Sequence, residues 1–202
     1  MSETKERPYH HGDLRHALVE TALTMLATDQ SWTFTLREVA RRTGVSHAAP
    51  YKHFRDREDL LRELARIGFV RLGQAMTQAM SSSQSSTREK FVAGARACIA
   101  FAIQNSGLYR LMFSTDADKS ADPDLHATAM GTFGILLQLL KNGQQDGSFR
   151  LITINALAAA GWAQVHGLAM LAISGQLLEE KVGSEPVQAA LDVLLEGMCR
   201  TD

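Results

Sequence analysis

The segment from Thr35 to Ser46 constrains the fold most strongly, because it contains the signals that end one helix and begin another. Thr35 and Glu38 have the spacing of a capping box, in which each side chain satisfies a free backbone amide at a helix start. Gly44 can adopt the left-handed conformation that ends a helix, and Ser46 can cap the next one. The spacing therefore predicts two short helices joined by a tight turn, the helix-turn-helix arrangement.

The rest of the chain has almost entirely helical periodicity. Leu14, Leu18 and Met25 belong to an apolar stripe with the spacing of one helix face, and Asp56 can cap a long helix. Strand signals are confined to a short β-branched patch at 149–154. We therefore expect an all-α protein. Its predicted helices, about nine in number, cover residues 14–26, 36–43, 47–54, 57–80, 88–105, 107–114, 123–145, 153–177 and 185–200.

Serine-rich residues 81–86 form the one low-complexity stretch, which indicates a domain boundary there or before it. We expect residues 9–56 to form a helix-turn-helix domain that also takes in the start of the connecting helix, to about residue 66. Residues 57–202 would then form a second helical domain. The long helix 57–80 would touch both domains and could transmit movement between them.

Composition excludes several classes of protein. Of the 202 residues, 45% are hydrophobic and 21% are charged, so the bulk of the chain is not intrinsically disordered. Gly, His, Gln or a charge interrupts each apolar run before the roughly 18 residues that a membrane span needs. The N-terminal residues lack the apolar core of a signal peptide. With only Cys98 and Cys199 available to pair, we expect a reduced, cytoplasmic protein without a membrane partner.

Neither a metal site nor an enzyme is expected. Most of the histidines precede residue 54, without a nearby cysteine or a carboxylate at metal-ligand spacing, so we expect no metal and no cofactor. A nucleophile and base could be assembled from Ser46, His47 and Asp56, or from Cys98 and His166. Neither set lies in a recognisable nucleophile turn, and glycine-rich phosphate loops and paired catalytic carboxylates are missing from the sequence.

Residues 35–61, "TLREVARRTGVSHAAPYKHFRDREDLL", resemble the DNA-binding segment of TetR/AcrR-family transcriptional regulators. Residues 9–23, "YHHGDLRHALVETAL", are similar to the first helix of that family and its entry. Residues 107–113, "GLYRLMF", and 161–171, "GWAQVHGLAML", resemble the regulatory domain of a subgroup named for a Trp-His-Gly motif.

The resemblance implies roles in DNA binding. Arg37 matches a position that can reach a base or a phosphate. His47, Ala48 and Ala49 occupy the first turn of the recognition helix, where the histidine can bond a base edge and the alanines can touch a thymine methyl group. Pro50 cannot donate an amide hydrogen, so we expect a local distortion of this helix. The positions placed for phosphate contacts are Thr35, Ser46, Tyr51, Lys52, His53 and Arg57.

Soft and aromatic side chains on the C-terminal helices form either an ordinary core or a ligand pocket. Methionine and large aromatic residues suit a reshapable apolar pocket. The shortage of charged residues on these helices predicts a neutral or weakly polar ligand. The candidate pocket residues are Cys98, Phe101, Met112, Phe113, Met130, Phe133, Leu137, Trp162, His166 and Met170.

The helix from Ile154 to Ile173 is apolar on nearly every side, and its alanines and glycines allow another helix to approach closely. A helix of this kind must be covered on every side, either within one chain or by a second copy. We expect a second copy, whose matching helices complete a four-helix interface. The candidate interface residues are Ala159, Gly167, Leu191, Leu194, Leu195 and Met198.

Together these features predict a homodimeric regulator, a repressor of transcription. It would bind a palindromic double-stranded DNA operator and be released by a small-molecule effector that binds the C-terminal domain. The alternative is a DNA-binding regulator whose C-terminal domain only dimerises and has no ligand.

Overall fold

The computed structural model describes residues 11–81, 85–120 and 122–199, with side chains from residue 14 onward. These ranges are folded into helices, which confirms the all-α prediction. An isolated antiparallel β-bridge joins Phe149 to Cys199. The elements in chain order are α1 (His11–Asp29), α2 (Leu36–Thr43), the 3-10 helix η1 (Pro50–Lys52), α3 (Arg57–Ala79), α4 (Thr87–Gln104), α5 (Ser106–Met112), α6 (Pro123–Gln145), α7 (Ile154–Ile173), α8 (Glu179–Val182) and α9 (Pro186–Met198).

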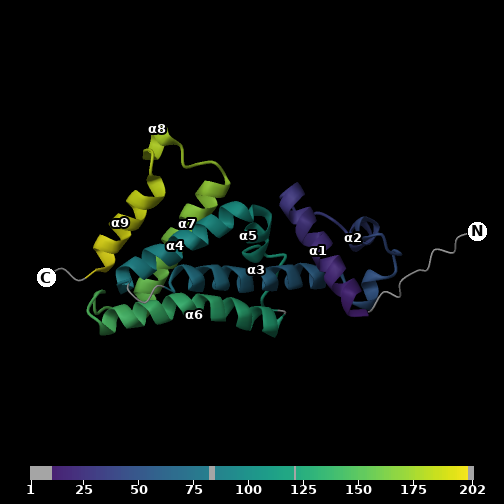
Figure 1. Cartoon of the computed structure of the whole chain (residues 1–202), viewed down its shortest axis with the longest axis horizontal. Coiled ribbons are helices and arrows are strands. Elements are labelled where there is room, and N and C mark those ends of the chain that lie inside the picture. The colour runs from purple at the N-terminus through teal and green to yellow at the C-terminus, as the bar shows by residue number, and fades with distance from the viewer. Residues whose placement is uncertain (1–10, 82–84, 121, 200–202) are drawn as a thin grey trace, which may run out of the picture.

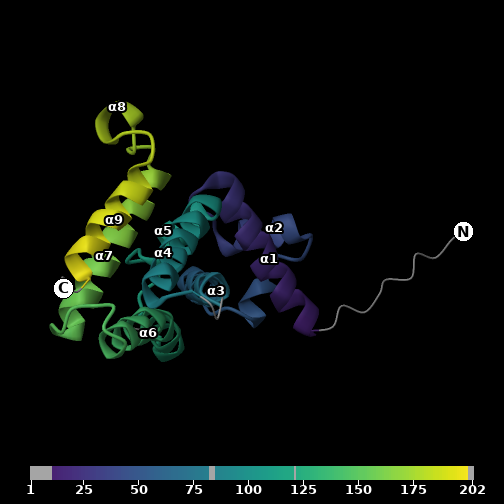
Figure 2. The ribbon, with the colours of Figure 1, turned by 60° about the vertical axis from the view of Figure 1, so that its left-hand side comes forward.

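The molecule is elongated, and α3 connects its two ends (Figure 1). The head, residues 11–56, contains α1, α2 and η1, and α7, α8 and α9 lie at the opposite end. α6 runs alongside α3, while α4 and α5 pack on α3 from another side (Figure 2). The long connecting helix predicted from the sequence is therefore confirmed. The division into domains at residue 57 stays a prediction, and its start at residue 9 lies outside the described residues.

The signals in the first half of the helix-turn-helix produce the predicted structure. The Thr35 hydroxyl accepts from the Glu38 amide, and the Glu38 carboxylate accepts from the Thr35 amide at 2.6 Å. Gly44 has φ 78°, a left-handed conformation in which its amide bonds the last carbonyls of α2. Val39 and Ala40 are fully buried, which allows α2 to pack closely on α1.

The second helix of this motif differs from the prediction. Residues 47–54 do not form an α-helix: a turn covers 47–49, and the 3-10 helix η1 follows at Pro50–Lys52. Pro50 has no amide hydrogen, so the α-helical bond back to the Ser46 carbonyl cannot form, and the Ala49 amide bonds that carbonyl at 3.0 Å instead. The helix cap predicted for Ser46 is accordingly wrong, because Ala49 stands at the N-cap of η1.

One continuous apolar core extends from the head along α3 into the C-terminal helices. It contains Leu18 of α1, Phe54 of the head and Leu64 of α3, and it continues to Leu191 of α9. A second cluster forms where α4, α6, α7 and α9 meet, around Phe149. Buried residues of the head and of the C-terminal helices both pack on α3. A shift of α3 would therefore change the side-chain packing at both ends of the molecule.

Candidate nucleic-acid interface and ligand cavity

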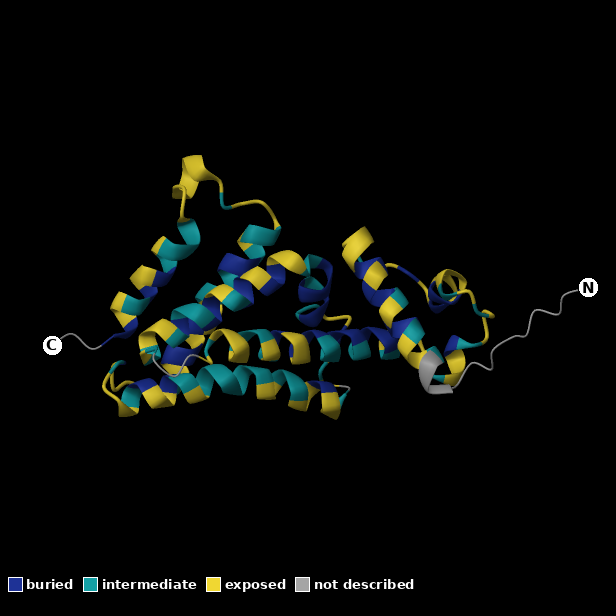
Figure 3. Ribbon diagram, viewed as in Figure 1, coloured by how far each residue is buried: buried dark blue, intermediate teal, exposed yellow. Residues whose placement is uncertain are grey.

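The turn after α2 presents its side chains to solvent at the tip of the head. Four of the eight residues of α2 and most of this turn are exposed (Figure 3). His47 and Ala48 are exposed, Ala49 is half-buried, and Pro50 is buried beneath them. Seven of the ten predicted DNA-contacting residues are exposed. They are Thr35, Arg37, Ser46, His47, Ala48, Tyr51 and Lys52.

Thr35 has a structural role whether or not it touches DNA. Its amide and hydroxyl both bond the Glu38 carboxylate. These bonds hold the pKa of Glu38 below its ordinary value, so the carboxylate stays ionised at the positive end of the α2 dipole. Arg37, the neighbouring cation, is exposed on the outer face of α2.

His53 and Arg57 are less accessible than the residues of the turn. The Nε2 atom of His53 is buried and has no hydrogen-bond partner. The Arg57 guanidinium donates to the carbonyl of Phe34 at 2.9 Å and to the carbonyl of Trp32. Arg57 therefore fastens the α1–α2 loop to the start of α3, and its expected phosphate contact stays a prediction.

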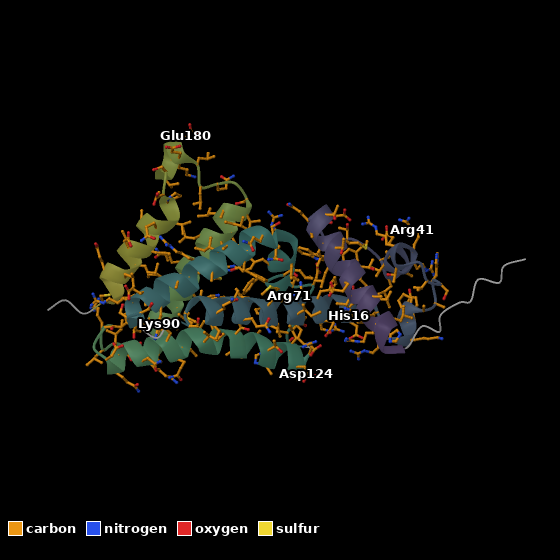
Figure 4. All side chains as sticks on the ribbon, in the orientation of Figure 1. His16, Arg41, Arg71, Lys90, Asp124 and Glu180 are labelled. Carbon is orange, nitrogen blue, oxygen red and sulfur yellow. The ribbon has the colours of Figure 1, made fainter. Side chains whose placement is uncertain are left out.

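Several other cations near the head are neutralised within the chain. Arg42 lies 3.4 Å from Asp29, and Arg66 bonds Glu63 at 2.8 Å. Arg62 lies 3.6 Å from Asp122 at the start of α6. Arg41, in contrast, is exposed at the head end of the molecule (Figure 4). The exposed positive charge of the head is thus concentrated on α2 and on the turn that follows it.

A cavity of about 540 Å³ lies between α3, α4, α5, α6 and α7. Its volume is within the range of sites for small organic molecules, and its lining is predominantly apolar. The second half of α3 forms one wall, through Phe69, Leu72 and Met76. The same helix that begins in the head therefore borders the cavity.

The structure brings together six of the ten predicted pocket residues. Those bordering the cavity are Cys98, Phe113, Met130, Phe133, Trp162 and His166. The other four lie elsewhere: Phe101 is buried in the main core, Met112 packs on Gly68, Met170 packs against the main core, and Leu137 packs in the second cluster. Whether the six contact a ligand stays a prediction.

Tyr109 joins the polar groups of the cavity wall, and the sequence did not single it out. Its hydroxyl lies 3.0 Å from Nδ1 of His166 and 3.9 Å from the Cys98 sulfur. Burial lowers the pKa of His166 and raises the pKa of Cys98 to about 11, so both groups are neutral at pH 7. Phe113 packs against His166, with the ring centroids 4.5 Å apart. The segment 107–113 thus contributes an aromatic and polar corner to the cavity.

Lys119 is a second lining residue that was not predicted from the sequence. It lies between α5 and α6, in the segment 113–122. Helical periodicity gives no signal for a residue outside a helix, and the predicted pocket residues all belong to predicted helices. This lysine changes the charge of a cavity that was expected to take a neutral ligand.

The predicted interface residues on α7 and α9 divide into two groups. Ala159 is exposed and Gly167 is partly exposed on α7. Leu191, Leu194 and Met198 of α9 are buried against their own chain, because that face of α9 packs on α7, and Leu195 packs beside them. The exposed large hydrophobic residue of α9 is Val193, with 68% of its surface accessible.

α7 is long and apolar enough to cross a membrane, judged by length and composition alone. Its 20 residues include an 18-residue window of mean hydropathy 1.5, of which 28% is buried in the protein. From the sequence, the Gly, Gln and His residues were expected to prevent such a match. Because most of this window is not fully buried within its own chain, the exposed face of α7 remains available to a second surface.

Comparison with known proteins identifies the family. Residues 19–64 match bacterial regulatory proteins of the tetR family, and residues 91–198 match the tetracyclin repressor-like C-terminal domain. A protein with unknown function from Rhodococcus sp. RHA1, whose structure is known, has 35% sequence identity to this chain. The two structures superpose with a TM-score of 0.85 over 96% of this chain and 100% of that one. A TetR family transcription regulator from Marinobacter aquaeolei VT8 has a TM-score of 0.70 at 16% identity, covering 93% and 96% of the two chains.

A curated relative matches the head. It is an uncharacterized HTH-type transcriptional regulator from Haemophilus influenzae, 38% identical over 66 residues, which are 32% of this chain and 32% of the relative. The chain thus matches about a third of that relative's length. The Trp-His-Gly subgroup stays a prediction, since the two family matches do not show it. The two family matches and the shared fold show that the chain belongs to the tetR family of bacterial regulatory proteins and is a DNA-binding transcription regulator.

Proposed function

We propose that the protein is a ligand-responsive repressor, which binds a palindromic operator as a homodimer and is released by a small, mainly apolar effector. One observation carries the proposal: α3 begins in the head at Arg57, and its second half borders the cavity. An effector in the cavity would therefore contact the helix that supports the DNA-reading turn. The protein would work in the cytoplasm, without a catalytic step or a cofactor.

Two heads about 34–36 Å apart would reach successive major grooves of the operator. An effector that binds more tightly to a conformation with another head separation would shift the protein away from DNA. Tight binding alone would not do so, because an effector with equal affinity for both conformations leaves their ratio unchanged.

The exposure of the turn supports separate sets of residues for contacts to bases and contacts to phosphates. We assign base contacts to His47, with methyl contacts from Ala48 and Ala49, and phosphate contacts to Arg37, Ser46, Tyr51 and Lys52. Thr35, His53 and Arg57 would position the turn, because each is bonded within the chain or partly buried. This assignment narrows the set of phosphate contacts implied by the resemblance.

The outer face of α7 supports a homodimer. Ala156, Ala159, Ala160 and Ala163 are exposed on it, and small side chains let a second helix approach closely. A second copy would cover this face symmetrically, with Val193 of α9 at its side. Purified protein that stays dimeric and dissolved without detergent would support this cover, whereas a requirement for detergent would favour a membrane.

The function is tested by exposing the purified protein to a pool of random DNA duplexes and sequencing those it retains. An enriched palindrome is expected, and a reporter under that operator should be repressed. A lack of enrichment at low salt would mean either that the motif does not read DNA or that a ligand acts as corepressor. Repeating the selection with small molecules extracted from cells separates these outcomes.

The cavity favours this proposal over a regulator whose C-terminal domain only dimerises. The two differ in one measurement: a compound that raises the melting temperature should also change affinity for the selected operator. If no compound both raises the melting temperature and changes operator affinity, the result supports the dimerisation-only alternative.

A further inference from the structure

The cavity has one ionic feature in an otherwise apolar lining. Among the described residues that border it, Lys119 supplies the one ammonium group, and Arg, Asp and Glu are absent. A charged side chain in such surroundings is costly unless another group compensates it. The charge and position of Lys119 therefore restrict what the cavity can hold.

The ammonium of Lys119 is held at the cavity wall by aromatic rings. Its Nζ atom lies 5.5 Å from the ring centroid of Phe69 and 5.8 Å from that of Phe113. The two rings are themselves in edge-to-face contact, with centroids 5.5 Å apart. Both rings border the cavity, so these cation–π contacts keep the charge at the cavity rather than in bulk solvent.

The surroundings of Lys119 only partly replace the water that it has lost. Burial lowers its pKa, and the nearby carboxylate of Asp118 opposes that shift without reversing it. Asp118 is itself exposed, and its Oδ1 atom accepts hydrogen bonds from the amide and hydroxyl of Ser120 at 2.8 and 2.7 Å. An anion inside the cavity would therefore stabilise the charged form of Lys119.

The two hydroxyl groups in the lining are engaged with the protein. The Thr132 hydroxyl lies 3.0 Å from the carbonyl of Phe69, and the Tyr109 hydroxyl is bonded to His166. These groups offer no second positive charge. The cavity thus combines one cation with extensive apolar surface, which suits a molecule that has one anionic end and an apolar body.

We propose that the effector is an apolar monoanion, such as an aliphatic or aromatic carboxylate, and that Lys119 binds its charged group. This inference rests on the proposed ligand response and specifies its chemistry. It replaces the neutral effector expected from the helices alone. The apolar body would lie along α3 and α7, between Phe69 and Trp162.

The test compares matched compounds that differ only in the end group. One set is octanoate, octanol and octylamine, and the other is 4-phenylbutyrate, 4-phenylbutanol and 4-phenylbutylamine. Dissociation constants are measured by calorimetry on the full chain in the absence of DNA. At least one acid should bind at least about tenfold more tightly than its alcohol, the gain expected of one charge-assisted hydrogen bond, and the amine should bind more weakly still.

Variants assign the preference to Lys119. Lys119→Met should remove the advantage of the acid over the alcohol while leaving the alcohol affinity within about twofold, because only the ionic contact is lost. Lys119→Arg should retain the preference. Lys141→Met is the matched control, since Lys141 is exposed on α6 and does not border the cavity. Melting temperatures of the unliganded variants establish that each is folded.

Three outcomes would overturn the proposal: equal binding of acids and alcohols, an unchanged acid preference in Lys119→Met, or binding of neither acid to the original protein. Failure of the proposed function is seen separately, in the DNA selection. If the protein binds an acid but enriches no operator, this inference stands and the proposed repressor function is wrong. If the protein enriches an operator but binds neither acid, only this inference is wrong.

Discussion

The hydroxyl of Tyr109 lies 3.0 Å from Nδ1 of His166, and this hydrogen bond joins α5 to α7 at the wall of the cavity. Burial raises the pKa of Tyr109 and lowers the pKa of His166, so the phenol keeps its proton and the imidazole is neutral at pH 7. If the phenol donates, Nε2 of His166, a residue that borders the cavity, carries the ring hydrogen. The pair thus links packing between two helices to the polarity of the site.

Tyr109→Phe should lower the free energy of unfolding by about 1 kcal/mol, because the ring packing is kept while His166 loses its partner. Chemical denaturation measures the change. Tyr51→Phe is the matched control, since the Tyr51 side chain is 53% exposed, and it should change stability by less than about 0.5 kcal/mol. Equal effects of the two substitutions would mean that the hydrogen bond contributes nothing to stability.

Local signals explain why most of the fold was predictable. Thr35, Glu38, Gly44 and Asp56 act within a few residues of the chain, and each produced the predicted helix end. Pro50 is also local, but its effect was underestimated: one missing donor replaced the whole predicted helix 47–54 by a turn and the 3-10 helix η1.

The site was less predictable because it depends on contacts between distant segments. Lys119 lies outside a helix, so no periodicity indicates that it faces the cavity. On α9, the apolar stripe correctly identifies Leu191 and Leu194 as buried. A stripe does not specify which surface covers it, and here residues of the same chain pack against Leu191 and Leu194.

Gly107→Ala should destabilise the contact between the head and the C-terminal helices. A Cβ atom at Gly107 would lie 2.5 Å from the carbonyl oxygen of Leu26, so α5 and α1 would have to separate. We expect a loss of about 1–3 kcal/mol in the free energy of unfolding. Gly131→Ala on α6 is the control, because nothing lies within 4 Å of the point where its methyl group would be, and it should stabilise the protein by up to about 1 kcal/mol. If Gly107→Ala leaves the free energy of unfolding unchanged, α1 and α5 can separate without cost.

Lys52 and Arg57 should respond differently to removal of their charge. Lys52→Ala should reduce the slope of log affinity against log salt for every duplex by about 0.9, the value for one phosphate contact, and leave the melting temperature unchanged. Arg57→Ala should instead lower the melting temperature, because its bonds to the Phe34 and Trp32 carbonyls are lost. Filter binding over a salt series and thermal denaturation separate these effects. If Arg57→Ala keeps its melting temperature but changes the slope of log affinity against log salt, the predicted phosphate contact of Arg57 is supported.

Glu63 should make the stability of the head depend on pH. Burial alone would raise the pKa of Glu63, but hydrogen bonds from Arg66 and Arg15 outweigh burial and hold it below its ordinary value of 4.5. The stabilisation is therefore complete above pH 4.5 and is lost as the pH falls through the lowered pKa. Glu63→Gln should cost about 1 kcal/mol at pH 7 and progressively less in acid. Glu180→Gln, at an exposed position on α8, should show no such trend, and a constant cost for Glu63→Gln would contradict the ion-pair explanation.

Val193→Glu should weaken dimerisation, because the substitution places a charge where the proposal puts an apolar contact with a second copy. The Val193 side chain is 68% exposed in a single chain, so the monomer can accept glutamate without burying it. In the dimer the same carboxylate would lose water without gaining a partner, and the dissociation constant should rise at least about tenfold. Leu151→Glu is the matched control, since Leu151 is 77% exposed between α6 and α7, outside the proposed interface. Sedimentation velocity over a concentration series distinguishes the outcomes: a monomeric Leu151→Glu would move the interface to the α6–α7 loop, and a dimeric Val193→Glu would exclude that face of α9.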